Sequence, residues 1–93
     1  MEYSFEWDEE RSRENLGKHG ISFLEATTVF RDPFAMLTFD PDHSWAESRY
    51  ILLGFSIDGR LLVVSFTERP PKTRLISARR ATRRERRIYE EEN

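Results

Sequence analysis

Apolar and polar residues alternate in several short stretches of this chain, as they do in strands that bury one face. Near the N-terminus, Tyr3, Phe5 and Trp7 fall on one side of a predicted first strand. The same alternation, or a continuous apolar run, predicts further strands at 34–39, 49–56, 61–67 and 73–79. The run at 61–67 is almost entirely apolar, which favours the centre of the sheet.

Alternation also predicts the two faces of the last strand. Arg74 and Ala78 would point one way, and Leu75 and Arg79 the other.

Two helices are predicted between the first and second strands. Asp8 is an N-cap for a helix that ends before Gly20, the expected left-handed residue after its last turn. Ser22 and Glu25 have the spacing of a capping box for a second helix at 23–30.

Thr82 and Glu85 form a further capping box, which predicts a third helix at 83–92. Asp58-Gly59 is a hairpin signal, and a Pro-Pro pair follows at 70–71. With the helices against one face, the fold class is α+β: a small, four- to five-stranded antiparallel sheet with two N-terminal helices and one C-terminal helix.

Composition limits the classes of protein to consider. The 93 residues form one domain, 1–93, without a repeat or a linker. The chain has no cysteine, no basic signal-peptide start and no apolar run near the roughly 20 residues that span a bilayer, so we expect a cytoplasmic protein without a membrane contact. Two histidines are too few for a convincing zinc site, and we expect neither a metal nor a cofactor.

Charge is distributed unevenly along the chain. Residues 1–59 hold 12 acidic and 5 basic side chains, whereas residues 60–87 hold 2 acidic and 10 basic ones. This asymmetry indicates a surface for a polyanion, and RNA is the first candidate.

Six arginines lie in three adjacent pairs: Arg79, Arg80, Arg83, Arg84, Arg86 and Arg87. Guanidinium groups bind phosphate in a bidentate way, and a helix N-terminus adds free N–H groups. We expect the arginines of the last strand and of the helix's first turns to converge on one anion pocket. The alternative is a solvated charged face that pairs with Glu85 and the acidic run at 90–92.

Lys18 and His19 are the second candidates. Histidine is the usual general acid or base near neutral pH, and lysine can neutralise a developing phosphate charge. The alternative is that both only complement the negative end of their helix. Metal-free scission of RNA needs such proton transfer, for which His19 or Tyr89 is available, and cations that stabilise the phosphate.

The segments FEWDEERSRENLGKHGISFLEA, RYILLG, DGRLLVV and LISARRATRRERRIYEE carry a family resemblance. They resemble the BrnT toxins of bacterial type II toxin–antitoxin systems over nearly the whole chain. The most specific strings are KHGISF at 18–23 and ISARRATRRERRIY at 76–89.

The resemblance implies a RelE-like fold and a ribonuclease that arrests growth by cutting RNA. It also implies a BrnA-like antitoxin with a ribbon-helix-helix part, which neutralises the toxin and through which operator DNA is bound, with a toxin–antitoxin heterotetramer as one assembly. Six positions match the family's motifs and are the catalytic candidates: Lys18, His19, Arg49, Arg79, Arg83 and Tyr89. Four more arginines are candidates for RNA binding: Arg80, Arg84, Arg86 and Arg87.

In the expected mechanism, Arg79 and Arg83 hold the scissile phosphate, and Arg49 supports the same cleft from a neighbouring strand. His19 is the acid or base, with Tyr89 as its substitute. Two alternatives stay open: a module that binds RNA without cleaving it, and an interaction protein whose charges pair with a partner chain.

Overall fold

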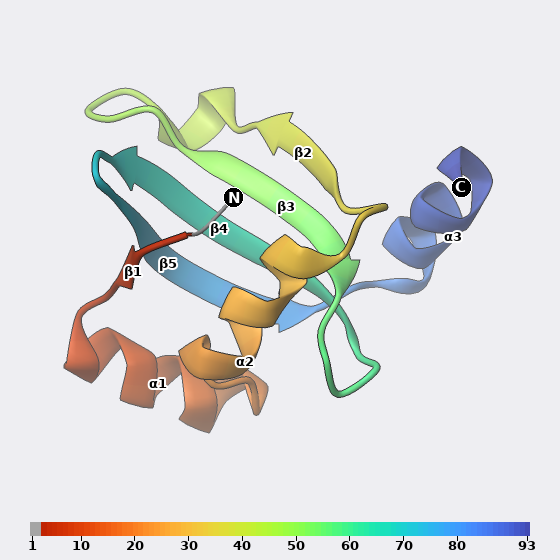
Figure 1. Cartoon of the computed structure of the whole chain (residues 1–93), viewed down its shortest axis with the longest axis horizontal. Coiled ribbons are helices and arrows are strands. Elements are labelled where there is room, and N and C mark those ends of the chain that lie inside the picture. The colour runs from red at the N-terminus through yellow and green to blue at the C-terminus, as the bar shows by residue number, and fades with distance from the viewer. Residues whose placement is uncertain (1–2) are drawn as a thin grey trace.

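The computed structural model describes residues 3–93 and confirms the α+β prediction (Figure 1). Five strands form one sheet in the order β1-β5-β4-β3-β2. They are β1 (Phe5–Glu6), β2 (Met36–Phe39), β3 (Tyr50–Phe55), β4 (Leu61–Arg69) and β5 (Lys72–Arg80). The helices are α1 (Glu9–His19), α2 (Phe23–Thr28) and α3 (Arg83–Glu92), with short 3₁₀ turns η1 (Val29–Arg31) and η2 (Pro41–His43).

The apolar strand β4 is central, as predicted, because β5 and β3 pair with it on either side. Its neighbours are antiparallel, but β1 runs parallel to β5, so the sheet is mixed. The sequence pattern did not predict this, since alternation indicates the faces of a strand and not the direction of its neighbour.

β5 contains a bulge. Ser65 pairs with Ser77, but the next residue of β4, Phe66, pairs with Leu75, so Ile76 has no partner of its own. An extra residue in one strand interrupts strict alternation at that point.

The bulge changes which arginines share a face. Leu75 and Ala78, predicted on opposite faces, are both buried in one core cluster. Arg74 and Arg79 consequently lie together on the other face. The predicted alternation is wrong at Ile76, because a bulge depends on the partner strand and leaves no signal in the local pattern.

Each face of the sheet carries an apolar cluster. The larger one joins the sheet to the segment around α2 and consists of Ile21, Phe23, Ala26, Val29, Leu52, Leu62, Val64, Phe66, Leu75 and Ala78. The smaller one consists of Leu53, Leu61, Val63 and Tyr89. Since Tyr89 belongs to α3, this helix packs on the face opposite α2, and Figure 1 shows it apart from α1 and α2. The prediction that all helices cover one face is therefore wrong for α3.

The predicted helix ends are present. The Asp8 side chain accepts a hydrogen bond from the Arg11 N–H, and Gly20 is left-handed with φ 72°. Thr82 and Glu85 form the complete capping box of α3. At α2 only half of the box is present, because Ser22 accepts from the Glu25 N–H while the Glu25 carboxylate binds elsewhere.

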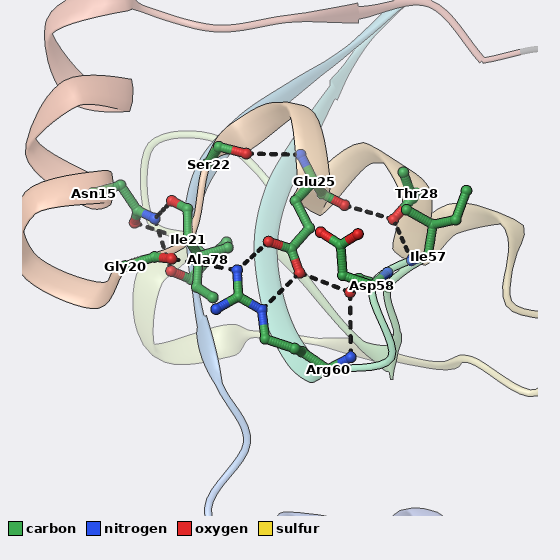
Figure 2. Close-up of polar contacts among 11 residues, drawn as sticks. Asn15, Gly20, Ile21, Ser22, Glu25, Thr28, Ile57, Asp58, Arg60 and Ala78 are labelled. Atoms are coloured by element: carbon green, nitrogen blue, oxygen red, sulfur yellow. Dashed lines mark hydrogen bonds and ion pairs between the residues drawn. The ribbon is translucent and has the colours of Figure 1, made fainter.

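Glu25 binds the β3–β4 hairpin instead (Figure 2). Its carboxylate is buried and accepts from Ser56 Oγ at 2.7 Å and from Arg60 Nε at 2.9 Å. Arg60 also donates to the Gly20 carbonyl at 3.3 Å. The hydrogen bonds from Arg60 hold the pKa of Glu25 below its usual value, so the pair stays ionised and fastens the hairpin to the helical layer.

None of the helices in residues 3–93 combines the length and the apolar sequence needed to cross a bilayer.

Candidate functional site

The face of the sheet opposite α2 is only partly covered, because α3 packs at one end of it. We call the remainder the open face. Its residues follow from the pairing register and the alternation of the strands: Glu6, Thr38, Arg49, Ile51, Ser65, Thr67, Arg74, Ser77 and Arg79. The paired side chains of Ser65 and Ser77 are small and half-buried, and they form its floor.

Asn15 fastens α1 to the edge of β5 (Figure 2). Its Nδ2 donates to the Ala78 carbonyl at 2.8 Å and to the Ile21 carbonyl at 2.9 Å, and its Oδ1 accepts from the Ala78 N–H at 3.0 Å. β1 pairs with β5 only at Thr73 and Arg74. At Ala78 the Asn15 side chain therefore makes the hydrogen bonds that a neighbouring strand would otherwise make. An amide that reproduces both bonds of a strand edge fixes the position of α1 along β5.

The last turn of α1 therefore lies beside the open face. A shallow pocket of about 260 Å³ lies there, and its lining includes one carboxylate beside the basic side chains: Arg11, Glu14, Asn15, Lys18, His19, Ile76 and Ser77. The imidazole is half-buried and the lysine is exposed. A phosphate group above Ser77 would have an imidazole and an ammonium group at its side, which are the groups that proton transfer and charge neutralisation require.

Arg79 is engaged by a carboxylate of α3. Its two terminal nitrogens donate to Glu85 Oε1 at 2.8 Å and Oε2 at 2.9 Å. Glu85 also accepts from the Thr82 N–H at 2.8 Å. The hydrogen bonds from Arg79 lower the pKa of Glu85 to about 2, and the same bonds raise the pKa of Arg79. Arg79 thus carries a counter-ion, and its side chain remains 41% exposed.

Four arginines of α3 are exposed: Arg83, Arg84, Arg86 and Arg87. Within residues 3–93 none of them forms a salt bridge, so the alternative pairing with the acidic run at 90–92 is not seen there. Of that alternative, only the pairing with Glu85 is present, and it is made by Arg79. The Arg86 guanidinium lies 5.7 Å from the centre of the Phe55 ring. These exposed arginines give α3 a positive surface that a polyanion could contact.

The prediction that these arginines share one anion pocket is wrong for Arg80. Arg80 pairs with Leu62 of the larger core cluster, so it lies on the face opposite Arg79. Arg49 directly precedes β3 at the end far from α3. Arg49 falls opposite Thr67 of β4, whereas Arg79 pairs with Val63. These two positions are four residues apart along β4, or about 13 Å at about 3.3 Å per residue. Pairing register, which separates these side chains, is not visible in the spacing of the sequence.

Tyr89 is buried, and its hydroxyl donates to Asp32 Oδ2 at 2.7 Å. Burial and the Asp32 carboxylate raise the pKa of Tyr89 to about 12. Asp32 also accepts from the N–H groups of Phe34 and Phe55, so the tyrosine joins α3 to the start of β2 and the end of β3. Its predicted part in proton transfer stays a prediction; in this conformation its contacts are structural.

Asn15, Thr67 and Arg74 are polar residues of this site that the sequence patterns did not indicate. Asn15 lies on a helix that is polar almost throughout, and Arg74 lies in an alternating strand, so neither stands out locally. Within residues 3–93, no three His, Asp or Glu side chains gather closely enough to hold a metal ion.

Comparison with known proteins decides the family. The family described as "Ribonuclease toxin, BrnT, of type II toxin-antitoxin system" matches residues 7–85. The chain belongs to the BrnT family. It is therefore a ribonuclease toxin of a type II toxin–antitoxin system, in which a toxin pairs with an antitoxin and acts on RNA.

One solved structure supports the fold of this BrnT-family chain. The crystal structure of the Brucella abortus ribonuclease toxin, BrnT, superposes with a TM-score of 0.64 and 21% sequence identity, covering 88% of this chain and 100% of that one. At this identity the likeness confirms the fold. No curated protein sequence matches the chain.

Proposed function

We propose that this BrnT-family toxin is an endoribonuclease that cuts RNA without a metal ion, in the pocket between Lys18, His19 and Ser77. The observation that carries the proposal is the contact of Asn15 with Ala78, because it holds the imidazole and the ammonium group beside the open face. A general acid or base must lie within reach of the proton that it moves, and a rigid attachment provides that position.

In this mechanism the 2′-hydroxyl of the RNA attacks the neighbouring phosphate above the serine floor. His19 takes the proton of that hydroxyl, a bond forms between O2′ and phosphorus, and the bond to O5′ breaks. The protonated imidazole then gives a proton to the leaving 5′-oxygen, and the products carry a 2′,3′-cyclic phosphate and a 5′-hydroxyl. Lys18 and Arg79 stabilise the charge on the phosphate, with Arg83 at the start of α3 beside them.

The exposed arginines of α3 extend the positive surface from the cleavage pocket. Arg84, Arg86 and Arg87 would bind the RNA backbone without reading its sequence. Arg80 lies on the other face and has no place in the proposed site.

The proposal extends to the partner. A BrnA-like antitoxin with a ribbon-helix-helix part would neutralise the toxin in the cytoplasm, and a heterotetramer of the two would bind operator DNA only through the antitoxin. Family membership supports this assignment. Growth arrest on expression of the toxin, relieved by the protein encoded in the adjoining reading frame, tests it.

Cleavage itself is tested with purified protein and single-stranded RNA in EDTA. We expect fragments with 2′,3′-cyclic phosphate ends and a loss of kcat of about a hundredfold or more for His19→Ala. RNA that is bound but intact would identify a binding module instead. A fully active His19→Ala protein with a native circular-dichroism spectrum would exclude the imidazole as the acid or base.

Arg79→Ala is expected to abolish growth arrest while the protein remains folded. Glu85→Gln is the matched control, because it breaks the same ion pair and leaves the guanidinium in place. If both variants lose activity equally, activity depends on the Arg79–Glu85 ion pair and not on the charge of Arg79 alone.

A further inference from the structure

At the end of the open face far from α3, three strands and the residue before a fourth contribute one row of polar side chains. Glu6 pairs with Arg74, and Arg74 pairs with Thr67. Arg49 precedes Tyr50, the partner of Phe66, so it falls opposite Thr67. The row thus reads Glu6, Arg74, Thr67 and Arg49 across the sheet.

Two buried atoms of this row have no hydrogen-bond partner within residues 3–93: Arg49 Nε and Thr67 Oγ1. Thr67 is only 1% exposed. An unpartnered buried polar group costs about 1–3 kcal/mol, and neighbouring groups of this kind are uncommon in folded proteins. Because they are neighbours on one face, one ligand with several acceptor oxygens could satisfy both.

The charges around the row favour an anion. Arg74 Nη1 lies 3.2 Å from Glu6 Oε2, and Arg69 binds Glu47 through two hydrogen bonds of 2.9 and 3.0 Å. Arg49 has no salt bridge within residues 3–93. Three guanidinium groups therefore lie near two carboxylates. Arg49 is near Glu47, whose pKa its charge helps to lower, but it forms no salt bridge and lies in the row beside the unpartnered hydroxyl.

We propose that Arg49, Arg74 and Thr67 form a second phosphate-binding site, which holds an RNA phosphate next to the scissile one. Thr67 is two residues of β4, or about 7 Å, from the serine floor on which the proposed cleavage site rests. Arg49 thereby binds substrate at this second site and does not support the catalytic cleft of Arg79. The Glu6 carboxylate competes with the phosphate for Arg74, so Glu6 limits the affinity.

The site makes opposite predictions for the two members of one ion pair. With a ten-nucleotide 2′-O-methyl RNA, which binds but lacks the attacking hydroxyl, Arg74→Ala should weaken the affinity roughly tenfold, as the loss of a charge-assisted hydrogen bond does. Glu6→Gln breaks the same ion pair and should strengthen binding severalfold.

Thr67→Val keeps the shape of the side chain, removes the hydroxyl and should weaken binding. Arg31→Ala, an exposed arginine outside the open face, is the control and should leave the affinity unchanged.

Fluorescence anisotropy of the labelled RNA measures these affinities. Weaker binding by both Arg74→Ala and Glu6→Gln would show that the ion pair is structural and would overturn the proposal, as would no change in either. The second phosphate site rests on the proposed ribonuclease function, but separate measurements test the site and the cleavage. The 2′-O-methyl RNA reports binding alone, whereas unmodified RNA that stays intact with the unchanged protein would remove only the cleavage claim.

Discussion

The carboxylate of Glu85 holds together the junction between β5 and α3, since it accepts hydrogen bonds from Arg79 and from the Thr82 N–H. Its pKa falls from 4.5 to about 2 in the folded protein. A carboxyl whose folded pKa is lowered stabilises the fold fully above its unfolded value. That contribution is lost as the pH falls from about 4.5 towards 2.

Glu85→Gln should consequently lower the free energy of unfolding at neutral pH by about 1 kcal/mol, a value limited by the exposure of Arg79. The difference from the unchanged protein should disappear as the pH falls through this window. Thermal melts at a series of pH values measure it, with the exposed Glu90→Gln as control. A difference that persists at low pH would contradict the role of the ionised carboxylate.

Tyr89→Phe separates the two roles that the tyrosine could have. Loss of its hydrogen bond to Asp32 should destabilise the protein by about 1 kcal/mol, because Asp32 keeps two backbone donors. If the contacts of the hydroxyl are only structural, kcat per folded molecule stays the same. Urea unfolding and RNA cleavage by the same preparation decide between the roles, and a large loss of kcat would restore the tyrosine as a proton donor.

Among the three α-helices, α1 has the least apolar attachment: its Leu16 is 52% exposed, and its buried residue is Asn15. Asn15→Leu should destabilise the fold by about 2–4 kcal/mol, because it leaves the N–H and carbonyl of Ala78 without partners. Cleavage should fall as well, since this helix carries Lys18 and His19. Denaturant unfolding and activity measure both effects, and Arg13→Ala, exposed on the same helix, should change neither.

Strands and helices differ in how well the local pattern predicts them. The third helix was predicted at 83–92 and is found as Arg83–Glu92, because its capping box is contained in four consecutive residues. The bulge at Ile76 was not predicted, since it depends on how β5 aligns with β4. Because of this bulge, Arg74 and Arg79 share a face of the sheet, and the open face includes both of them.

Over the whole molecule, the basic residues that we propose bind RNA lie on α3, at the end of α1 and on the open face. The affinity for single-stranded RNA should fall with salt concentration, with a slope that shrinks by about 0.7 for each lost phosphate contact. Arg83→Gln combined with Arg87→Gln should therefore flatten the plot of log affinity against log salt by up to about 1.4. Arg13→Gln with Arg31→Gln is the matched pair outside the proposed surface, and an equal effect of the two pairs would show that only net charge matters.

Local sequence alone determined the helix caps, the apolar strands, the central place of β4 and the basic character of the C-terminal third. It also carried the strings that identify the family. The tertiary structure decided which polar and charged groups meet: Glu85 engages Arg79, Asn15 brings His19 to β5, and Arg49 falls opposite Thr67. The physical reason is that caps and alternation involve residues close in sequence. Register, bulges and ion pairs join residues far apart in the chain, and they form only when the whole sheet is assembled.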